Sequence, residues 1–360
     1  MGYITTTARC LCLAVAFSLC LISLRYATPG NIINERFSIP SSRTDRANAT
    51  FLVICQNEDL SKVLRSVQQM EDRFNERFGY PWAFLNDEPF TEDFMSRVRA
   101  MTKAQVSFGV IEKEQWEQPE WINKTKAAHL RKSMFLSRVP FGGSVRHRSL
   151  YRFSSGFLSK HPMLDRYQYY WRLEPGSQYP CNILYDPFKF MQKENKTYGF
   201  NLATREVEQT IPTLWETVYD FMTDNADLAA DSNAMGFLTD DEGDSYNLCH
   251  YESSFEILDM TFLRRDAYTQ YFQYLDRKGG FFYERWGSAP VLSIALSLFL
   301  DKDQTHFFDD IGFRHEELQH CPNGDAHARA RCSCDPEDNF DRDKQSCLGR
   351  WEALRVNVSL

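Results

Sequence analysis

The stretch that decides the fold is ATFLVICQNEDLSKVLRSVQQMEDRFNERFGYPWAFL, residues 49–85. It opens with a six-residue apolar run, 49–54, of the kind that forms a buried strand. Apolar residues then recur at helical spacing from Leu60 to Phe74, and a second short apolar run follows at 82–85. Strand, helix and strand with short connections make a βαβ unit, so this stretch predicts parallel strands joined by a right-handed crossover.

Further apolar runs extend this pattern towards the C-terminus. We expect strands at 106–111 and 169–173 and a helix whose apolar face includes residues 268–275. A nearly all-apolar run, 289–300, predicts a buried helix with Ser288 as its N-cap. Together these elements predict one α/β domain over residues 49–360.

Composition excludes several classes of protein. Of the 360 residues, 43% are hydrophobic and 14% aromatic, which rules out a disordered chain. The chain carries 41 Lys and Arg against 49 Asp and Glu, a net charge of -8. Since sequence-independent binding to nucleic acid needs a basic surface, we expect no nucleic-acid partner.

The amino-terminal segment predicts membrane targeting. Arg9 and Arg25 bracket an uncharged run of mostly apolar residues, 10–24. Such a run fits the core of a cleaved signal peptide, a short uncleaved signal-anchor or, as a third interpretation, a buried helix. We favour the anchor because no clear small-residue cleavage motif follows. The predicted order is a cytosolic tail (1–9), a transmembrane helix (10–25), a polar stem (26–48) and a lumenal domain (49–360).

Sequons and cysteines fit a lumenal domain. Four N-x-[ST] sequons begin at Asn48, Asn123, Asn195 and Asn357. Seven cysteines lie outside the apolar run, which predicts up to three disulfides and one thiol left over. We interpret the C-terminal cysteine cluster, 321–347, as a disulfide-pinned tail, because its spacing does not match a zinc site.

Three polar residues stand out once the common catalytic signatures are found to be missing. Glu174 follows a strand-like run at the edge where α/β proteins bind ligands. Glu256 lies between apolar neighbours that would raise its pKa unless it is paired. His315 offers an imidazole for a metal site. Each also has a structural interpretation, and the acidic run 240–244 is interpreted as a solvated loop.

Several long motifs resemble one family. The sequence is similar to the fungal α-1,2-mannosyltransferases of glycosyltransferase family 15 from about residue 49 to the C-terminal cysteines. The resemblance rests on NDEPF (86–90), RFSSG (152–156), YWRLEP (170–175), TIPTLW (210–215), SFEI (254–257), GGFFYERWG (279–287) and HFFDDIG (306–312).

The resemblance implies a fold, a reaction and a location. The fold is a GT-A-like α/β fold with a mixed sheet and flanking helices. The donor is GDP-mannose and the cofactor is Mn²⁺. Mannose is transferred with retention to a mannose of an O-linked or N-linked glycan, carried by a glycoprotein or oligosaccharide acceptor. The location is the Golgi membrane, as a single-pass type II protein with its catalytic domain in the lumen.

The resemblance also implies roles for individual residues. Glu256 matches the family's proposed nucleophile. Glu174 falls at the metal and the donor, and His315 matches a metal ligand. Asn57 falls on the donor side. Glu206 and His147 fall on the acceptor side.

Three departures from the family pattern keep an alternative open. Gln56 stands where the family has Arg, His147 where it has Tyr, and Ser288 where it has Asp. The loss of Arg removes a guanidinium able to form paired hydrogen bonds with phosphate. The alternative is a catalytically weak or inactive paralogue that binds glycan or a partner subunit; a secreted glycan-binding module is a third hypothesis.

Overall fold

The computed structural model describes residues 46–356, and the predicted anchor at 10–25, most of the stem and the sequon at Asn357 lie outside this range. All of the described residues belong to one compact unit. Within the described range, no helix combines the length and the apolar character needed to cross a bilayer.

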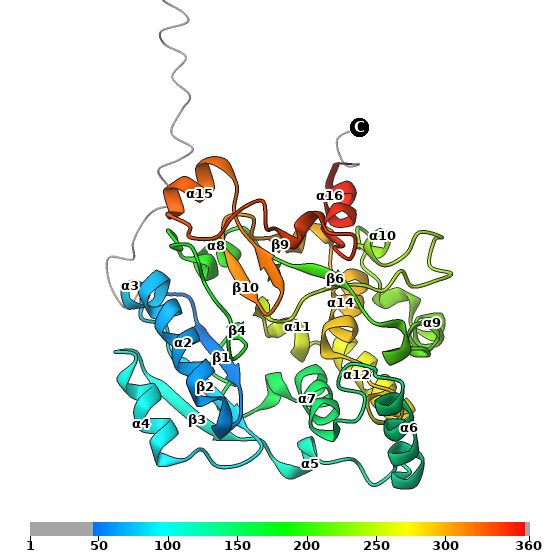
Figure 1. Ribbon diagram of the computed structural model, residues 1–360. Coiled ribbons are helices and arrows are strands. Elements are labelled where there is room, and N and C mark those ends of the chain that lie inside the picture. Colours follow the sequence, from blue (N-terminus) through cyan, green and yellow to red (C-terminus); the bar gives the residue numbers. More distant parts are fainter. Residues whose placement is uncertain (1–45, 357–360) are drawn as a thin grey trace, which may run out of the picture. The chain divides into compact units, whose positions relative to one another are not determined.

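A seven-stranded mixed sheet forms the centre of this unit (Figure 1). Its order is β3 (Val106–Val110), β2 (Trp82–Asn86), β1 (Ala49–Ile54), β4 (Tyr169–Leu173), β8 (Phe255–Asp259), β5 (Tyr198–Phe200) and β9 (Thr305–Phe307). Strands β1 to β4 run parallel, β8 is antiparallel to β4 and β5, and β9 is parallel to β5. The predicted βαβ unit and the mixed α/β sheet are therefore confirmed.

Two hydrophobic cores cover the two faces of the sheet, because successive side chains of a strand point to opposite sides. Phe51, Phe84 and Trp171 belong to one core. Leu52, Tyr170 and Leu258 belong to the other. The helices on the first side are α2 (Leu60–Met70), α3 (Glu76–Phe78), α4 (Glu92–Ala100) and α8 (Pro187–Lys193). Helix α2 continues into α3 through a π-helical turn, Glu71–Asn75.

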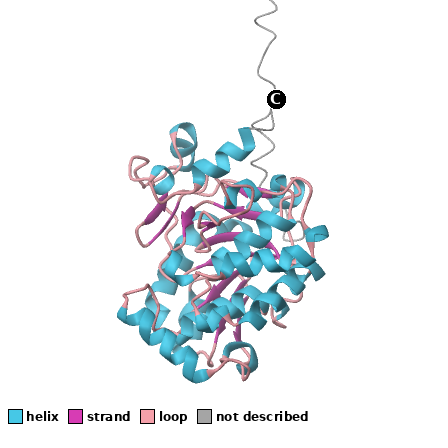
Figure 2. Cartoon of the chain, turned by 90° about the vertical axis from the view of Figure 1, so that its right-hand side faces the viewer, coloured by secondary structure: helices cyan, strands magenta, loops and turns pink. Residues whose placement is uncertain are grey.

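Longer helices pack against the second core. They are α7 (Val145–Gly156), α9 (Leu214–Asp224), α12 (Asp266–Lys278) and α14 (Ser288–Phe299). Figure 2 shows helices in front of the strands on this side. The remaining elements are α5 (Lys113–Trp116), α6 (Lys124–Leu136), α10 (Met235–Leu238), α11 (Thr261–Arg264), α13 (Gly280–Tyr283), α15 (Gly324–Ala330), α16 (Leu348–Val356), β6 (Ala203–Arg205) with β7 (Cys249–Tyr251), and β10 (Phe313–His315) with β11 (Leu318–His320), apart from short 3₁₀ turns.

Helix α14 is buried as predicted, but its start differs from the prediction. Gly287 is the N-cap and Ser288 is the first helical residue, with no side-chain cap. The Val291 N–H donates to the Gly287 carbonyl at 3.3 Å, so that carbonyl accepts the first bond of the helix. The predicted N-cap at Ser288 was therefore wrong by one residue. Pro290 fits any position of the first helical turn, so it did not fix the exact residue at which the helix begins.

Three disulfides hold the C-terminal tail, as the cysteine count predicted. They join Cys181 to Cys332, Cys249 to Cys347, and Cys321 to Cys334. Cys55 is the one free thiol among the described residues and is buried at the end of β1. The bonds tie the tail back to β7 and to the segment after β4, which positions the loops at that edge of the sheet.

Candidate active site

The pairing of β4 with β8 brings two carboxylates to one guanidinium. Arg172 lies directly opposite Glu256 in the antiparallel register, and Glu174 follows the end of β4. Arg172 Nε donates to Glu174 Oε1 at 2.7 Å, and its Nη1 lies 3.8 Å from Glu256 Oε1. The Arg172 side chain is only 4% exposed, so this is a buried charge cluster in which one cation faces two anions.

Glu256 is buried and has one oxygen without a protein partner. Tyr170 donates its hydroxyl to Glu256 Oε1 at 2.6 Å. The second oxygen, Oε2, is buried and accepts no hydrogen bond from any described residue. Burial raises the pKa of the Glu256 carboxyl, while Arg172 and the Tyr170 hydrogen bond oppose that rise. A buried acceptor without a partner is uncommon in a folded protein and marks a point where a ligand is expected.

A second cluster lies where α7 meets the start of α14. Arg285 Nη2 donates to Glu206 Oε1 at 3.1 Å, and Arg285 Nη1 lies 3.3 Å from the Tyr151 hydroxyl. The pKa of Tyr151 is raised, mainly because its hydroxyl is buried. The charge of Arg285 opposes this rise, and the carboxylates of Glu206, Glu252 and Glu174 add to it. Tyr151 is therefore within electrostatic range of carboxylates from both clusters.

His147 joins this region from one turn earlier on α7. Its ring stacks on Phe141 at 3.9 Å, and its Nδ1 lies 2.9 Å from Ser144 Oγ. Burial lowers the pKa of His147, Arg146 and Arg285 lower it further, and Glu174 opposes them. The structure thus brings His147, Glu174 and Glu206 into one electrostatic environment.

His315 reaches the same region through a backbone bridge. Its neighbour Arg314 exchanges two backbone hydrogen bonds, of 2.8 and 2.9 Å, with Gln178 in the loop after Glu174. The His315 imidazole interacts electrostatically with Glu252. Burial would raise the pKa of Glu252, but the His250 imidazole, whose Nε2 lies 3.8 Å from Glu252 Oε2, outweighs it, so the pKa of Glu252 is lowered.

The residues predicted to hold a metal suit Mn²⁺ in their donor atoms. An imidazole nitrogen and a carboxylate oxygen are both ligands that Mn²⁺ accepts. Among residues 46–356, the groups of three close side chains able to hold a metal all contain cysteines of the disulfides. Glu174 and His315 belong to no such group, so a metal ion bound by them would need further ligands from the substrate.

The side chain of Asn57, just after β1, makes hydrogen bonds within the protein. Its amide nitrogen donates to Glu88 Oε1 at 3.3 Å and to the Pro89 carbonyl at 3.2 Å. Its amide oxygen accepts the Thr91 N–H at 3.0 Å. These bonds fasten the NDEPF block to the end of β1, close to the Cys55 thiol, whose pKa is raised by burial and then by Asp59 and Glu174.

Besides His147, the other two departures from the family pattern, Ser288 and Gln56, also lie near these residues. Ser288 is 6% exposed at the start of α14, one residue after Gly287. A Cβ atom on Gly287 would lie 3.2 Å from Glu206 Oε2, which places the start of α14 beside that carboxylate. Arg146 is paired with Asp87 at the end of β2 and brings a guanidinium to the edge of the sheet where Gln56 stands.

Sequence reasoning missed five residues of these clusters as candidate site residues. Tyr170 and Arg172 were inside the quoted YWRLEP motif. Tyr170, Arg172 and Glu174 follow one another at intervals of two residues, which is a detectable sign that all three point to the same side of the sheet. Tyr151 and Arg285 adjoin or lie within other motifs. Glu252 gave no local signal, because the fold brings it near His315 and Tyr151, which are far away in sequence.

Comparisons with known proteins give one consistent family. The model of the family "Glycolipid 2-alpha-mannosyltransferase" matches residues 26–356. The chain is 45% identical over 318 residues to "Alpha-1,2 mannosyltransferase KTR1" of Saccharomyces cerevisiae, covering 88% of this chain and 81% of that protein. It is 44% identical over 306 residues to "Glycolipid 2-alpha-mannosyltransferase 2" of Candida albicans, covering 85% of this chain and 66% of that one.

Solved structures agree with these sequence matches. The mannosyltransferase Ktr4p from S. cerevisiae in complex with GDP superposes with a TM-score of 0.84 at 37% identity, covering 88% of this chain and 84% of that chain. Core-mannan synthase A from Aspergillus fumigatus, in its Mn/GDP form, gives 0.82 at 37% identity, covering 89% and 88%. With its fold, its motifs and almost its whole described length matched, the chain belongs to the glycolipid 2-alpha-mannosyltransferase family, glycosyltransferase family 15.

Proposed function

We propose that this protein is a retaining, Mn²⁺-dependent α-1,2-mannosyltransferase that moves mannose from GDP-mannose to a mannose of an O-linked or N-linked glycan. The observation that carries the proposal is the buried Glu256, with one oxygen held by Tyr170 and the other unpartnered. Family membership and relatives named as α-1,2-mannosyltransferases support the linkage. A relative crystallised in a Mn/GDP form supports the donor and the metal.

Glu174 and His315 would hold the metal ion. When bound, Mn²⁺ neutralises the diphosphate and so makes GDP a better leaving group. The hydrogen bond from Arg172 Nε to Glu174 Oε1 fixes the carboxylate and leaves its second oxygen for the ligand. Asn57 lies on the donor side, where it holds the NDEPF block in place.

Glu256 faces the anomeric carbon of the transferred mannose. Departure of GDP leaves a sugar with oxocarbenium character, and a carboxylate below its ring stabilises that charge or bonds to the carbon. Either role requires Glu256 to be ionised although burial raises its pKa. The Tyr170 hydroxyl and the Arg172 guanidinium favour the ionised form, so they are positioning residues for the nucleophile.

Glu206, His147 and Tyr151 form the acceptor side. Arg285 holds the Glu206 carboxylate, and hydroxyl groups of an acceptor mannose are suited to such a set of carboxylate, imidazole and phenol groups. Glu252 adds a further carboxylate, which interacts electrostatically with both Tyr151 and His315. The anchor at 10–25 would hold the enzyme in the Golgi membrane, and three disulfides fit the oxidising lumen.

The alternative function is a weak or inactive paralogue that binds glycan or a partner subunit. It is favoured by the uncharged Ser288, which is buried at the start of α14 where the family has an acidic residue. Against it, the chain has Glu174, Glu256 and His315, which a pure binding protein does not need.

Transfer and nucleotide binding separate the two functions. The full chain is incubated with GDP-mannose, Mn²⁺ and either mannose or α-mannobiose, and GDP release and the new linkage are measured. The enzyme should release GDP with formation of an α-1,2 linkage, and GDP should bind saturably only with Mn²⁺. Metal-dependent GDP binding without turnover on either acceptor would point to the inactive paralogue, and no GDP binding would contradict the proposal altogether.

A further inference from the structure

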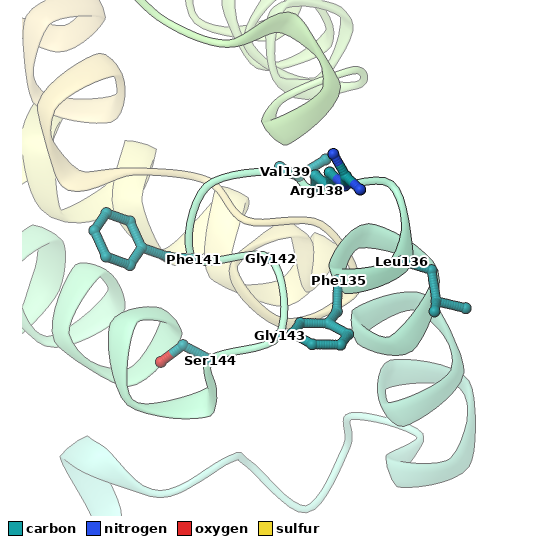
Figure 3. Close-up of a pocket in the computed structure, with 8 residues that line it drawn as sticks. All are labelled: Phe135, Leu136, Arg138, Val139, Phe141, Gly142, Gly143 and Ser144. Atoms are coloured by element: carbon teal, nitrogen blue, oxygen red, sulfur yellow. The ribbon is translucent and has the colours of Figure 1, made fainter.

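The loop between α6 and α7 builds an apolar pocket beside the acceptor side of the site. The pocket has a volume of about 690 Å³ (Figure 3). Helix α6 ends at Leu136 and α7 begins at Val145, so the loop is eight residues long. The side chains of the lining come from Phe135, Leu136, Arg138, Val139, Phe141 and Ser144.

Large apolar side chains are exposed on this surface. Phe135 is 68% exposed, Leu136 69% and Phe141 53%. Along the whole of α6, only Ala127 is buried. Apolar area left in water forgoes the stabilisation of burial, and a cluster of such side chains marks a binding surface more often than chance exposure does.

The loop is held in shape before any ligand arrives. The Val139 N–H donates to the Met134 carbonyl at 3.0 Å, and the Ser144 N–H donates to the Phe141 carbonyl at 2.9 Å. A Cβ atom on Gly142 would lie 2.7 Å from Met134 Cβ, so only glycine permits this close approach. Phe141 has a φ of +55°, an unfavourable conformation for a non-glycine residue, yet its ring remains mostly exposed.

The pocket is continuous with the acceptor side of the site. Phe141 stacks on His147 at 3.9 Å, and His147 packs edge-on against Tyr151 at 6.0 Å. Tyr151 in turn lies against Arg285, which holds Glu206. Figure 3 shows the Phe141 ring on the α7 side of the loop and Phe135 alongside Gly143. A row of rings therefore leads from the pocket to the candidate acceptor residues.

The chemistry of the lining selects the kind of group that it can bind. Arg138 is the one charged residue in the lining, and the Ser144 hydroxyl is already within hydrogen-bond distance of His147. A sugar ring carries several hydroxyl groups that would lose water here without finding partners. We propose that this pocket binds the apolar aglycone of an O-linked acceptor, the non-sugar group attached to the mannose that receives the transfer.

This inference rests on the proposed function, and two mannosides that differ only in their aglycone test it. Kinetics of the full chain are measured with methyl and with hexyl α-mannoside as acceptors. Burial of roughly two methylene groups predicts a KM on the order of tenfold lower for the hexyl compound. Equal KM values for the two acceptors would overturn the proposal.

Paired variants locate the effect. In the double variant Phe135→Ser/Leu136→Ser, whose two side chains are exposed, the ratio of the two KM values should fall to near one. Met101 is also an exposed apolar residue, 37% exposed at the end of α4, and Met101→Ser should keep the tenfold ratio. A ratio that survives in the double variant would contradict the assignment of the pocket.

Calorimetry tests the pocket without turnover. Hexyl and methyl α-mannoside are titrated into the full chain with GDP and Mn²⁺. Tighter binding of the hexyl compound that is lost in the double variant would support the pocket, even if no mannose is transferred. Equal binding overturns it. A self-association of the chain that the double variant abolishes, with no change in acceptor preference, would also overturn it and assign the surface to a second copy.

Discussion

Arg172 Nε lies 2.7 Å from Glu174 Oε1 while Nη1 of the same guanidinium lies 3.8 Å from Glu256 Oε1. The antiparallel pairing of β4 with β8 produces this arrangement, because it sets Arg172 opposite Glu256. One buried cation thus links the residue proposed to hold the metal with the residue proposed to act on the sugar. Small changes around this cation are expected to affect chemistry more than folding.

Replacing Glu256 by Gln should abolish transfer and leave the fold intact. Gln keeps the shape of the side chain and accepts the Tyr170 hydrogen bond, but it carries no negative charge to stabilise the sugar. We expect kcat to fall on the order of a thousandfold, with metal-dependent GDP binding preserved. Glu208→Gln, on the exposed surface, is the matched control. Normal turnover by the Glu256 variant would remove it from the mechanism.

Replacing Tyr170 by Phe should move the acid limb of the pH–rate profile. The Tyr170 hydroxyl donates to the ionised form of Glu256, and this hydrogen bond lowers the pKa of that carboxyl against the effect of burial. Without it the pKa rises, so Glu256 becomes protonated at a higher pH and activity is lost earlier as pH falls. A shift of about one pH unit is expected from a hydrogen bond to a charged group.

The profile of kcat/KM against pH measures this shift, because it reports the free enzyme. Tyr219→Phe is the matched control, since Tyr219 is 62% exposed on α9. Its acid limb should coincide with that of the wild type. An unmoved limb in the Tyr170 variant, together with normal stability, would mean that Glu256 does not set the acid limb.

Replacing His315 by Ala should raise the concentration of Mn²⁺ needed for half-maximal activity. His315 is half-buried on the β10–β11 hairpin, so its loss should cost little stability. Loss of one protein ligand is expected to weaken metal binding at least about tenfold. His129→Ala, on the exposed surface of α6, is the control. Identical Mn²⁺ titrations for the two variants would exclude His315 as a ligand.

Much of the sheet could be predicted from sequence because its signals are local. The runs at 49–54, 82–85 and 169–173 are continuous apolar stretches of strand length, and each lies in a buried strand. The short strands β5, β6 and β9, each of three residues, escaped prediction. Strand β5 pairs with β8 and β9, and β6 pairs with β7. These pairings are tertiary effects that no run of three residues can signal.

From the sequence, a site residue could be predicted only where a family motif lies at the end of a strand. Glu174 follows a clear strand, which identified its edge of the sheet from sequence. Tyr151 and Arg285 gain their meaning from each other, 134 positions apart along the chain, and Arg285 also from Glu206, 79 positions away. Three residues in contact across such separations leave no periodic trace. The start of α14 shows the same limit, because Gly287 and Ser288 are both acceptable N-caps.

The disulfides should differ in their contribution to stability according to the loop that each one closes. Cys249–Cys347 spans 98 residues and joins β7 to the residue before α16, whereas Cys321–Cys334 spans 13. In the chain-entropy account, the longer loop is worth about 2 kcal/mol more. The double variant Cys249→Ala/Cys347→Ala should therefore unfold at lower urea than Cys321→Ala/Cys334→Ala. Equal midpoints would show that native packing, and not loop closure, sets these contributions. Because β7 leads through Glu252 into the strand that carries Glu256, the first variant should also lose more activity below its unfolding midpoint.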